Sequence, residues 1–284
     1  MSCVNASSPR RSRSRSIIHL HAVDLLHAVQ KAVRRTVAQR CRLSSVTEQT
    51  TRTPNRRARL RAQASEEIKQ IALRLLAEGG PDAISLRAIA REMGMTAGAI
   101  YSYFRTRDDL VTVLIGDVYS SLVNSAEAAR DAVPEDDPGG RIMAWAEAFR
   151  AWALSRPEGF RLIYGDPVPG YQAPADGPGK AAELRACTAL TGLVAAAWPT
   201  AAPLHAGGRA YTWDEFDPSL TAHVREKFPD FPPEALALTL RIWGRMHGPL
   251  ALEVYGHVRP LIHDPTTTYQ DEMRDLVASL GLKV

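Results

Sequence analysis

The segment SLRAIAREMGMTAGAIYSYFRTRDDL, from Ser85 to Leu110, carries apolar residues at helical spacing but is interrupted by Met-Gly-Met and by Arg-Thr-Arg. One continuous helix does not explain this pattern, because a glycine inside a helix costs roughly 1 kcal/mol relative to alanine. Ser85 and Thr96 are good N-terminal caps, and Gly94 suits a left-handed helix end. The segment therefore predicts two short helices, Leu86 to Met93 and Ala97 to about Phe104, joined by a tight turn.

A third helix is expected to begin directly after Thr106. Asp109 lies three residues further on, which gives a Thr-x-x-Asp variant of the capping box. Two short helices joined by a glycine-containing turn form a helix-turn-helix, and Ala90, Gly94 and Ile100 stand where its corner needs a small residue, a glycine and an apolar contact.

The rest of the chain predicts an all-α fold. A first helix is expected from Ser65 to Gly79, with Ile68, Ile71, Ala72 and Leu75 on one buried face. Further helices are expected over residues 110–133, 141–155, 181–198, 234–258 and 266–280, with a short helix after Pro157 and a Pro/Gly-rich loop at 166–180. We therefore expect an N-terminal three-helix DNA-binding domain with a helix-turn-helix (63–110), followed by a larger helical ligand-binding and dimerisation domain (111–284).

Positive charge is concentrated at the N-terminus. Residues 1–62 carry 14 Lys/Arg against 2 Asp/Glu, a net of +12, whereas residues 63–284 carry 21 against 29, a net of −8. We expect residues 1–62 to be a basic, disordered leader. Its first 45 residues also resemble an organelle transit peptide. Alternatively, translation begins near Val46 and these residues result from a misassigned start. Five arginines between Arg52 and Arg61 predict an arm that binds phosphates or the minor groove.

The second helix of the motif offers candidate DNA contacts. Small residues at its start leave room for base edges and phosphates, and hydroxyl groups follow them. Arg87 and the arginines after the helix add positive charge, although Tyr101 alone is as often a core residue as a contact. The candidate DNA-binding residues are Arg87, Thr96, Ala97, Gly98, Ala99, Tyr101, Ser102, Tyr103 and Arg107, with Arg105 beside them.

These residues also carry a family resemblance. From about Ser65 to Leu114 the chain resembles the N-terminal domain of TetR-type transcriptional regulators, with a helix ending in Gly-Gly followed by AIAREMGMTAGAIYSYFRTRDDL. It has Arg at position 107, where the family usually has Lys. The resemblance implies that Ala97 to Tyr103 form the recognition helix and that Tyr101, Tyr103 and Arg107 contact phosphates.

Near the C-terminus an apolar stripe is expected on one helix. Leu236, Leu240, Trp243, His247, Leu250 and Val254 follow one another at spacings of 4 and 3. Gly244 and Gly248 allow another helix to approach closely, and Pro249 is expected to kink the helix. The string WGRMHG resembles the WHG type of C-terminal domain found in some TetR-like regulators. That resemblance implies homodimerisation through a four-helix bundle of the last two long helices.

Aromatic residues in the helical body suggest a ligand site. The candidates are Trp145, Phe149, Trp152, Tyr164, Trp243 and His247, with Phe160 and Tyr171 nearby in sequence. Each also suits an ordinary hydrophobic core, and a lone histidine on an apolar stripe is more often a core residue than a ligand contact.

The function expected from these patterns is sequence-specific transcriptional regulation, most simply a cytoplasmic homodimeric repressor released from a palindromic double-stranded operator by a small molecule. The alternative is an all-helical architectural protein that coats DNA without a specific ligand. The sequence shows no motif of a common enzyme class, no metal-ligand spacing and no cofactor loop, so we expect no catalytic, metal or cofactor site. We also expect no membrane span, because no long uninterrupted apolar run stands out.

Overall fold

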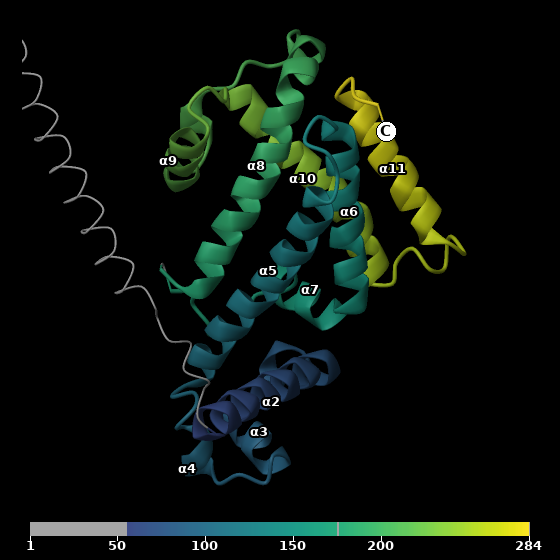
Figure 1. Cartoon of the computed structure of the whole chain (residues 1–284). Coiled ribbons are helices and arrows are strands. Elements are labelled where there is room, and N and C mark those ends of the chain that lie inside the picture. Colours follow the sequence, from purple (N-terminus) through teal and green to yellow (C-terminus); the bar gives the residue numbers. More distant parts are fainter. Residues whose placement is uncertain (1–55, 175, 284) are drawn as a thin grey trace, which may run out of the picture. The chain divides into compact units, whose positions relative to one another are not determined.

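The computed structural model describes residues 56–174 and 176–283, and all regular structure in these ranges is helical (Figure 1), which confirms the predicted fold class. The expected basic leader lies outside the described residues as far as residue 55. The helices of the N-terminal part are α2 (Arg56–Gly79), α3 (Leu86–Glu92), α4 (Ala97–Ile100) and α5 (Arg107–Asp131). The helices that follow are α6 (Pro138–Ser155), α7 (Pro157–Tyr164), α8 (Pro178–His205), α9 (Pro218–Lys227), α10 (Pro233–Val254) and α11 (Pro265–Ser279), with 3-10 turns at Pro81–Ala83 and Trp213–Glu215.

The predicted caps of the helix-turn-helix are confirmed. The Ser85 hydroxyl accepts a hydrogen bond from the Ala88 amide, and the Thr96 hydroxyl accepts one from the Ala99 amide. Thr106 forms a capping box with Asp109, with hydrogen bonds of 3.0 and 3.1 Å. Gly94 has φ of +65°, the left-handed conformation that ends α3 and turns the chain into α4.

In the N-terminal part, two helix boundaries differ from the prediction by more than two residues. The first helix begins at Arg56 rather than at Ser65, because the intervening residues are mostly arginine, alanine, leucine and glutamine, which favour helix. In the second case α4 ends at Ile100, before the predicted Phe104. The Ser102 and Tyr103 amides donate to carbonyls three residues back, over 3.1 and 2.9 Å, so the helix tightens into a turn.

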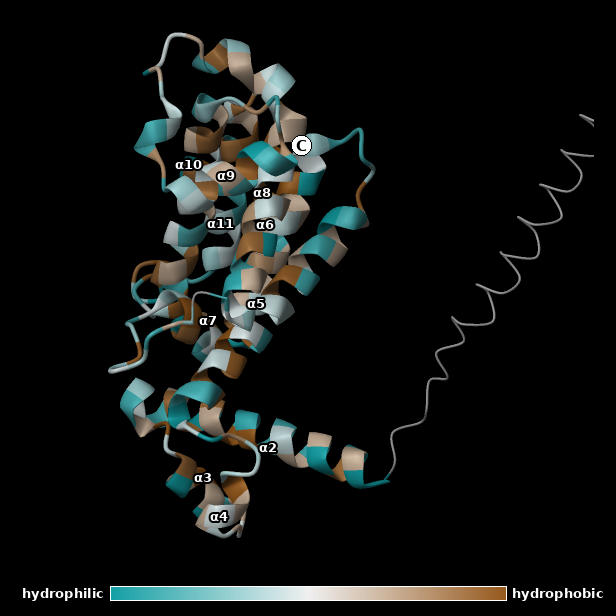
Figure 2. Ribbon diagram, turned by 90° about the vertical axis from the view of Figure 1, so that its left-hand side faces the viewer, coloured by the Kyte–Doolittle hydropathy of each residue, from teal (hydrophilic) through white to brown (hydrophobic). Residues whose placement is uncertain are grey.

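The helix-turn-helix packs around a small apolar core. Ile68 of α2, Ile89 of α3 and Ile100 of α4 are fully buried in it. The predicted face of α2 is confirmed except that Leu76, rather than Leu75, is buried. Figure 2 shows the mixed hydrophilic and hydrophobic bands along α2 that a helix with one buried face requires.

The helical body is built around α5. This helix packs against both α6 and α8, and α10 packs against α6, α8 and α11. Residues from Arg61 to Val284 form one compact unit, and the predicted domain boundary after residue 110 falls inside α5. No break between compact units marks the predicted boundary, so the division into a DNA-binding and a ligand-binding domain stays a proposal.

Helix α8 is longer than predicted, since it begins at Pro178 and continues past Pro199 and Pro203. In the described part of the chain it is the one helix long and apolar enough, by length and composition, to cross a membrane. The expectation concerned an uninterrupted apolar run, and α8 is not one, because Lys180, Glu183 and Arg185 lie within it. Because α8 packs against α5 and α10 through buried residues such as Val194 and Ala197, we interpret it as a core helix.

The predicted single stripe on α10 is wrong. Leu236, Leu250 and Val254 are buried, but Leu240 and Trp243 are 44% and 42% exposed. Ile242 and Met246 are buried in their place, so α10 has a buried face and a separate exposed face. The helix continues through Pro249, whose missing amide does not end it.

Candidate DNA-binding surface and ligand cavity

The predicted DNA contacts mostly lie on one exposed surface at the helix-turn-helix. Arg87 is exposed on α3, and Thr96, Ala97 and Gly98 are exposed at the start of α4. Tyr101 and Ser102 are exposed in the turn that follows, whereas Ala99, Tyr103 and Arg107 are half-buried. The predicted recognition helix is thus one helical turn plus an aromatic turn, and not a helix through Tyr103.

Arg61 fixes that turn from the side of α2. Its guanidinium donates a 2.5 Å hydrogen bond to the Ser102 carbonyl and lies over the Tyr103 ring, 4.8 Å from the ring centroid. Arg61 was expected in a DNA-binding arm. The structure shows it bound to the backbone beside the candidate contacts, and it shows Arg56, Arg57 and Arg59 exposed on the first turns of α2.

Arg107 is directed into the protein. Its guanidinium donates to the carbonyls of Pro81, Ile84 and Pro169, over 2.7, 3.1 and 3.1 Å. A long planar cation with several fixed donors satisfies three carbonyls that diverge in this way. Three of its five N–H groups are used within the chain, so Arg107 positions these segments, and its contact with a phosphate stays a prediction.

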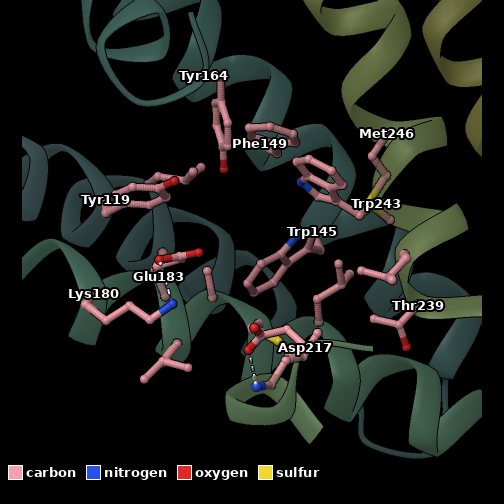
Figure 3. A pocket seen from close by; sticks show the side chains of 18 of the residues that line it. Tyr119, Trp145, Phe149, Tyr164, Lys180, Glu183, Asp217, Thr239, Trp243 and Met246 are labelled. Atoms are coloured by element: carbon pink, nitrogen blue, oxygen red, sulfur yellow. Dashed lines mark hydrogen bonds and ion pairs between the residues drawn. The ribbon is translucent and has the colours of Figure 1, made fainter. Parts of the chain in front are cut away.

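A cavity of about 410 Å³ lies within the helical body (Figure 3). Six helices, α5 to α10, contribute to its wall, which is mostly apolar. Of the predicted ligand contacts, Trp145, Phe149, Tyr164 and Trp243 line it. The volume is within the range of sites for drug-sized molecules.

Two predicted ligand contacts do not line this cavity. Trp152 is buried and donates its indole N–H to the Ser121 hydroxyl over 3.1 Å. His247 stacks on Phe160, with ring centroids 5.2 Å apart, behind the wall formed by Tyr164. A ligand role for Trp152 and His247 therefore has no support from this cavity, since residue type and spacing identify buried aromatic residues but not which neighbours they meet.

The sequence interpretation missed part of the wall. Tyr119 of α5, Glu183 and Cys187 of α8, and Asp217 at the start of α9 all line the cavity. No local motif marks these residues, since each lies on a different turn of a long helix or in a short helix that was not predicted. The signal available in the sequence was the run of residues 186–204 in α8, which contains no Asp, Glu, Lys or Arg.

Titratable groups at the cavity are strongly perturbed by burial. Burial and the negative charge of Glu183 raise the pKa of Tyr119 to about 12. Burial, together with Tyr119 and Glu183, raises the pKa of Tyr164 above its usual value, and burial raises the pKa of the Cys187 thiol. Both tyrosines therefore keep their hydroxyl protons at neutral pH.

Charged groups lie at the edge of the cavity. Lys180 and Glu183 form an ion pair of 3.3 Å, and both side chains are largely exposed. Asp217 caps α9 and accepts three hydrogen bonds on Oδ1, from the Ser219 amide, the Ser219 hydroxyl and the Leu220 amide. In the described ranges no group of three or more His, Cys, Asp or Glu side chains is arranged to hold a metal ion.

A helix-turn-helix with exposed hydroxyls and arginines, joined by one helix to a helical body with an internal cavity, is the architecture of a ligand-responsive DNA-binding regulator. Two family models match this chain: "Bacterial regulatory proteins, tetR family" over residues 69–114 and "Tetracyclin repressor-like, C-terminal domain" over residues 142–276. The second match includes the WGRMHG string.

Related proteins that align with most of this chain indicate the same family. The chain is 34% identical over 228 residues to the HTH-type transcriptional regulators Rv1816 of Mycobacterium tuberculosis and Mb1846 of Mycobacterium bovis, covering 78% of this chain and 94% of each relative. The chain therefore belongs to the TetR family of DNA-binding transcriptional regulators, which confirms the resemblance.

Solved structures give the same fold. The putative regulatory protein SCO4313 is 34% identical, with a TM-score of 0.60, covering 78% of this chain and 98% of that one. A protein of unknown function from Rhodococcus sp. RHA1 shares the fold at 20% identity, with a TM-score of 0.53, covering 84% of this chain and 100% of that one.

Proposed function

We propose that this chain is a homodimeric repressor that binds a palindromic operator and leaves it when a small molecule occupies the cavity between α5 and α10. The observation that supports this most directly is the path of α5. One end of this helix is held to the helix-turn-helix, and its middle carries Tyr119, Leu122 and Val123 into the cavity wall.

The connection between α5 and the helix-turn-helix is specific. Lys69 of α2 pairs with Asp117 of α5 at 2.5 Å and with Glu66 at 2.7 Å. Burial alone lowers the pKa of Lys69, but the hydrogen bonds to Asp117 and Glu66 outweigh it and raise that pKa. A ligand that displaces Tyr119 moves α5 at a point two residues from Asp117, and so moves the helix-turn-helix that Asp117 holds. In a dimer this changes the distance between the recognition segments of the two subunits, which is about 34–36 Å when both bind one face of DNA.

The exposed face of α10 supports the dimer. Leu240, Gly244, Gly248 and Leu252 follow one another at intervals of four residues, and all are exposed. A Cβ atom added at Gly244 or Gly248 meets nothing within 4 Å. This apolar, small-residue face, which we call the α10 face, suits close packing against the same helix of a second copy.

Binding to DNA fragments tests the first part of the proposal. Purified full-length protein is incubated with sheared genomic DNA, and the retained fragments are sequenced. A repressor enriches discrete sites with a palindrome, which it binds at least about a thousandfold more tightly than shuffled DNA. Sequence-independent retention with a steep salt dependence would instead support the architectural alternative.

Two tyrosines of equal exposure test the DNA surface. Tyr101→Phe removes a hydroxyl from the turn after α4, and Tyr255→Phe removes one from the helical body; these side chains are 43% and 41% exposed. We expect only the first to weaken operator binding, by about three- to tenfold for one lost phosphate hydrogen bond. Equal affinities for the two variants would remove Tyr101 from the interface.

The basic leader is tested by truncation. Because Arg56 begins α2, the deletion ends at residue 55 and leaves that helix whole. We expect lower affinity for all DNA sequences and a flatter salt dependence, with the site preference unchanged. An unchanged salt slope would show that the leader makes no phosphate contacts.

A further inference from the structure

Four aromatic side chains of the cavity wall carry polar groups that can donate a hydrogen bond. Tyr119, Tyr164, Trp145 and Trp243 point their hydroxyl or indole groups toward the middle of the space in Figure 3. Within the described residues none of these four groups has a hydrogen-bond partner. An indole N–H only donates, and a tyrosine hydroxyl, which is protonated at neutral pH, can donate one hydrogen bond and also accept.

The cavity wall also provides aromatic faces. Tyr164 lies 5.9 Å from Tyr119, 6.0 Å from Phe149 and 6.4 Å from Trp243, measured between ring centroids. These rings come from four different helices, so they surround the space and do not stack into one another. Such walls favour a flat ring system, because aromatic groups prefer edge-to-face and offset packing.

The charged side chains in the cavity wall do not favour a charged ligand over a neutral one. The one cation in the wall, Lys180, is paired with Glu183. The Asp217 carboxylate accepts its three hydrogen bonds within α9, at an exposed position. An anion gains no free cation there, and a cation gains only carboxylates that already have partners and remain in contact with water.

We propose that the cavity binds a neutral, ring-bearing molecule with at least one carbonyl oxygen, which accepts hydrogen bonds from Trp145 and Tyr164. This inference rests on the proposed function, because it specifies the chemical class of the ligand that this site takes. Leaving the donors unpaired penalises a hydrocarbon of the same shape, so the carbonyl is the selective group.

Four tricyclic probes of equal ring size separate the possibilities. They are 9-fluorenone, fluorene without the carbonyl, cationic 9-aminofluorene and anionic fluorene-9-carboxylate, titrated into the full-length protein by calorimetry without DNA. We expect 9-fluorenone to bind about tenfold more tightly than fluorene, the gain of one or two buried hydrogen bonds. Equal binding of these two, binding of neither, or preference for either charged probe would overturn the proposal.

Variants assign the effect to the named donors. Trp145→Phe and Tyr164→Phe keep a ring and remove one donor each, so each is expected to weaken 9-fluorenone about five- to tenfold and to leave fluorene unchanged. Trp152→Phe is the matched control, because its indole donates to Ser121 outside the cavity. Equal losses for both probes would mean that the rings act only by shape.

The same titrations remain decisive if the proposed function fails. Binding is measured without DNA, so a chain that selects no operator still reveals what its cavity prefers. Conversely, the operator affinity is measured without probe. Release of the operator by 9-fluorenone is then a separate measurement on the complex, and its absence counts against ligand control and not against the carbonyl preference.

Discussion

Arg107 and Pro169 are joined across 62 residues of chain by a hydrogen bond of 3.1 Å from the guanidinium to the main-chain carbonyl. Arg107 begins α5, and Pro169 lies in the segment between α7 and α8. The same guanidinium binds Pro81 and Ile84, which connect α2 to α3. One side chain therefore links the helix-turn-helix to the segment that leads into the cavity helix α8.

Arg107→Lys is expected to destabilise the protein by about 1–2 kcal/mol, because an ammonium group does not reach three diverging carbonyls at once. Urea unfolding of the two proteins measures the difference. Arg105→Lys is the control: Arg105 is exposed two residues earlier, and its replacement should change stability by less than about 0.5 kcal/mol. Similar midpoints for Arg107→Lys and the parent would mean that the three hydrogen bonds contribute nothing.

Gly94 and Gly98 form a second matched pair. A Cβ atom meets nothing within 4 Å at either position, but only Gly94 has a positive φ. Gly94→Ala is expected to cost about 1–2 kcal/mol of backbone strain, whereas Gly98→Ala should be neutral or stabilising by up to about 1 kcal/mol. Thermal unfolding distinguishes them, and equal effects would contradict the role of Gly94 as a left-handed corner.

The elements predicted best were those defined by local chemistry. Ser85, Thr96 and Thr106 each accept the capping hydrogen bond that the sequence indicated, because a cap depends on residues three positions away. The extension of α2 back to Arg56 was missed for a related reason. Ser65 is a good cap, but nothing before it breaks a helix, and helix formers continue through a weak stop signal.

The ligand cavity was predicted only in part. Trp145, Phe149, Tyr164 and Trp243 were identified as large aromatic residues, but Tyr119 and Asp217 come to the same space only through the packing of α5 and α9. Arg107 shows the same limit. Its sequence context matches a phosphate contact, and only the tertiary fold brings the Pro169 carbonyl within reach.

Arg150 and Glu253 connect α6 to α10 through two hydrogen bonds of 2.8 and 2.7 Å, and Arg150 also donates to Thr266 of α11. Their side chains are 15% and 10% exposed. Glu253→Gln leaves the guanidinium without its countercharge and should cost about 2–4 kcal/mol, less than for a fully buried pair. Asp271→Asn in the exposed pair with Arg274 is the control, at about 0–1 kcal/mol in denaturant unfolding. Equal shifts would contradict this ranking.

His247 predicts a pH dependence of stability. Burial lowers its pKa below the ordinary 6.5, and its buried Nδ1 has no hydrogen-bond partner among the described residues. The unfolded chain therefore binds the proton more readily than the folded chain. The contribution of neutral His247 to the free energy of unfolding is therefore complete above pH 6.5 and is lost as the pH falls below that value.

His247→Phe tests this pH dependence. The ring still stacks on Phe160, and the unpaired nitrogen is removed, so the variant should be as stable as the parent at pH 7.5 or about 1 kcal/mol more stable. Between pH 7.5 and 5.5 it should lose less stability than the parent, as measured by urea unfolding at each pH. Parallel pH profiles would show that His247 does not titrate differently on folding.

The α10 face gives a prediction about assembly. Gly244→Glu places a charged side chain on this face, and the added Cβ meets nothing within 4 Å in the subunit itself. Folding of the subunit should therefore be unaffected or slightly improved, since glutamate favours a helix interior over glycine by about 0.5–1 kcal/mol. A second copy packed on the same face meets two like charges, one from each subunit, in place of two small residues.

We expect Gly244→Glu to be monomeric in sedimentation equilibrium at concentrations where the parent is a dimer, with an unchanged helical circular dichroism spectrum. Leu261→Glu is the control, because Leu261 is 84% exposed in the segment between α10 and α11, off the α10 face. Since two linked helix-turn-helix units bind a palindrome, the monomer should also lose operator affinity while keeping sequence-independent binding. A dimeric Gly244→Glu protein would place the subunit interface elsewhere on the body.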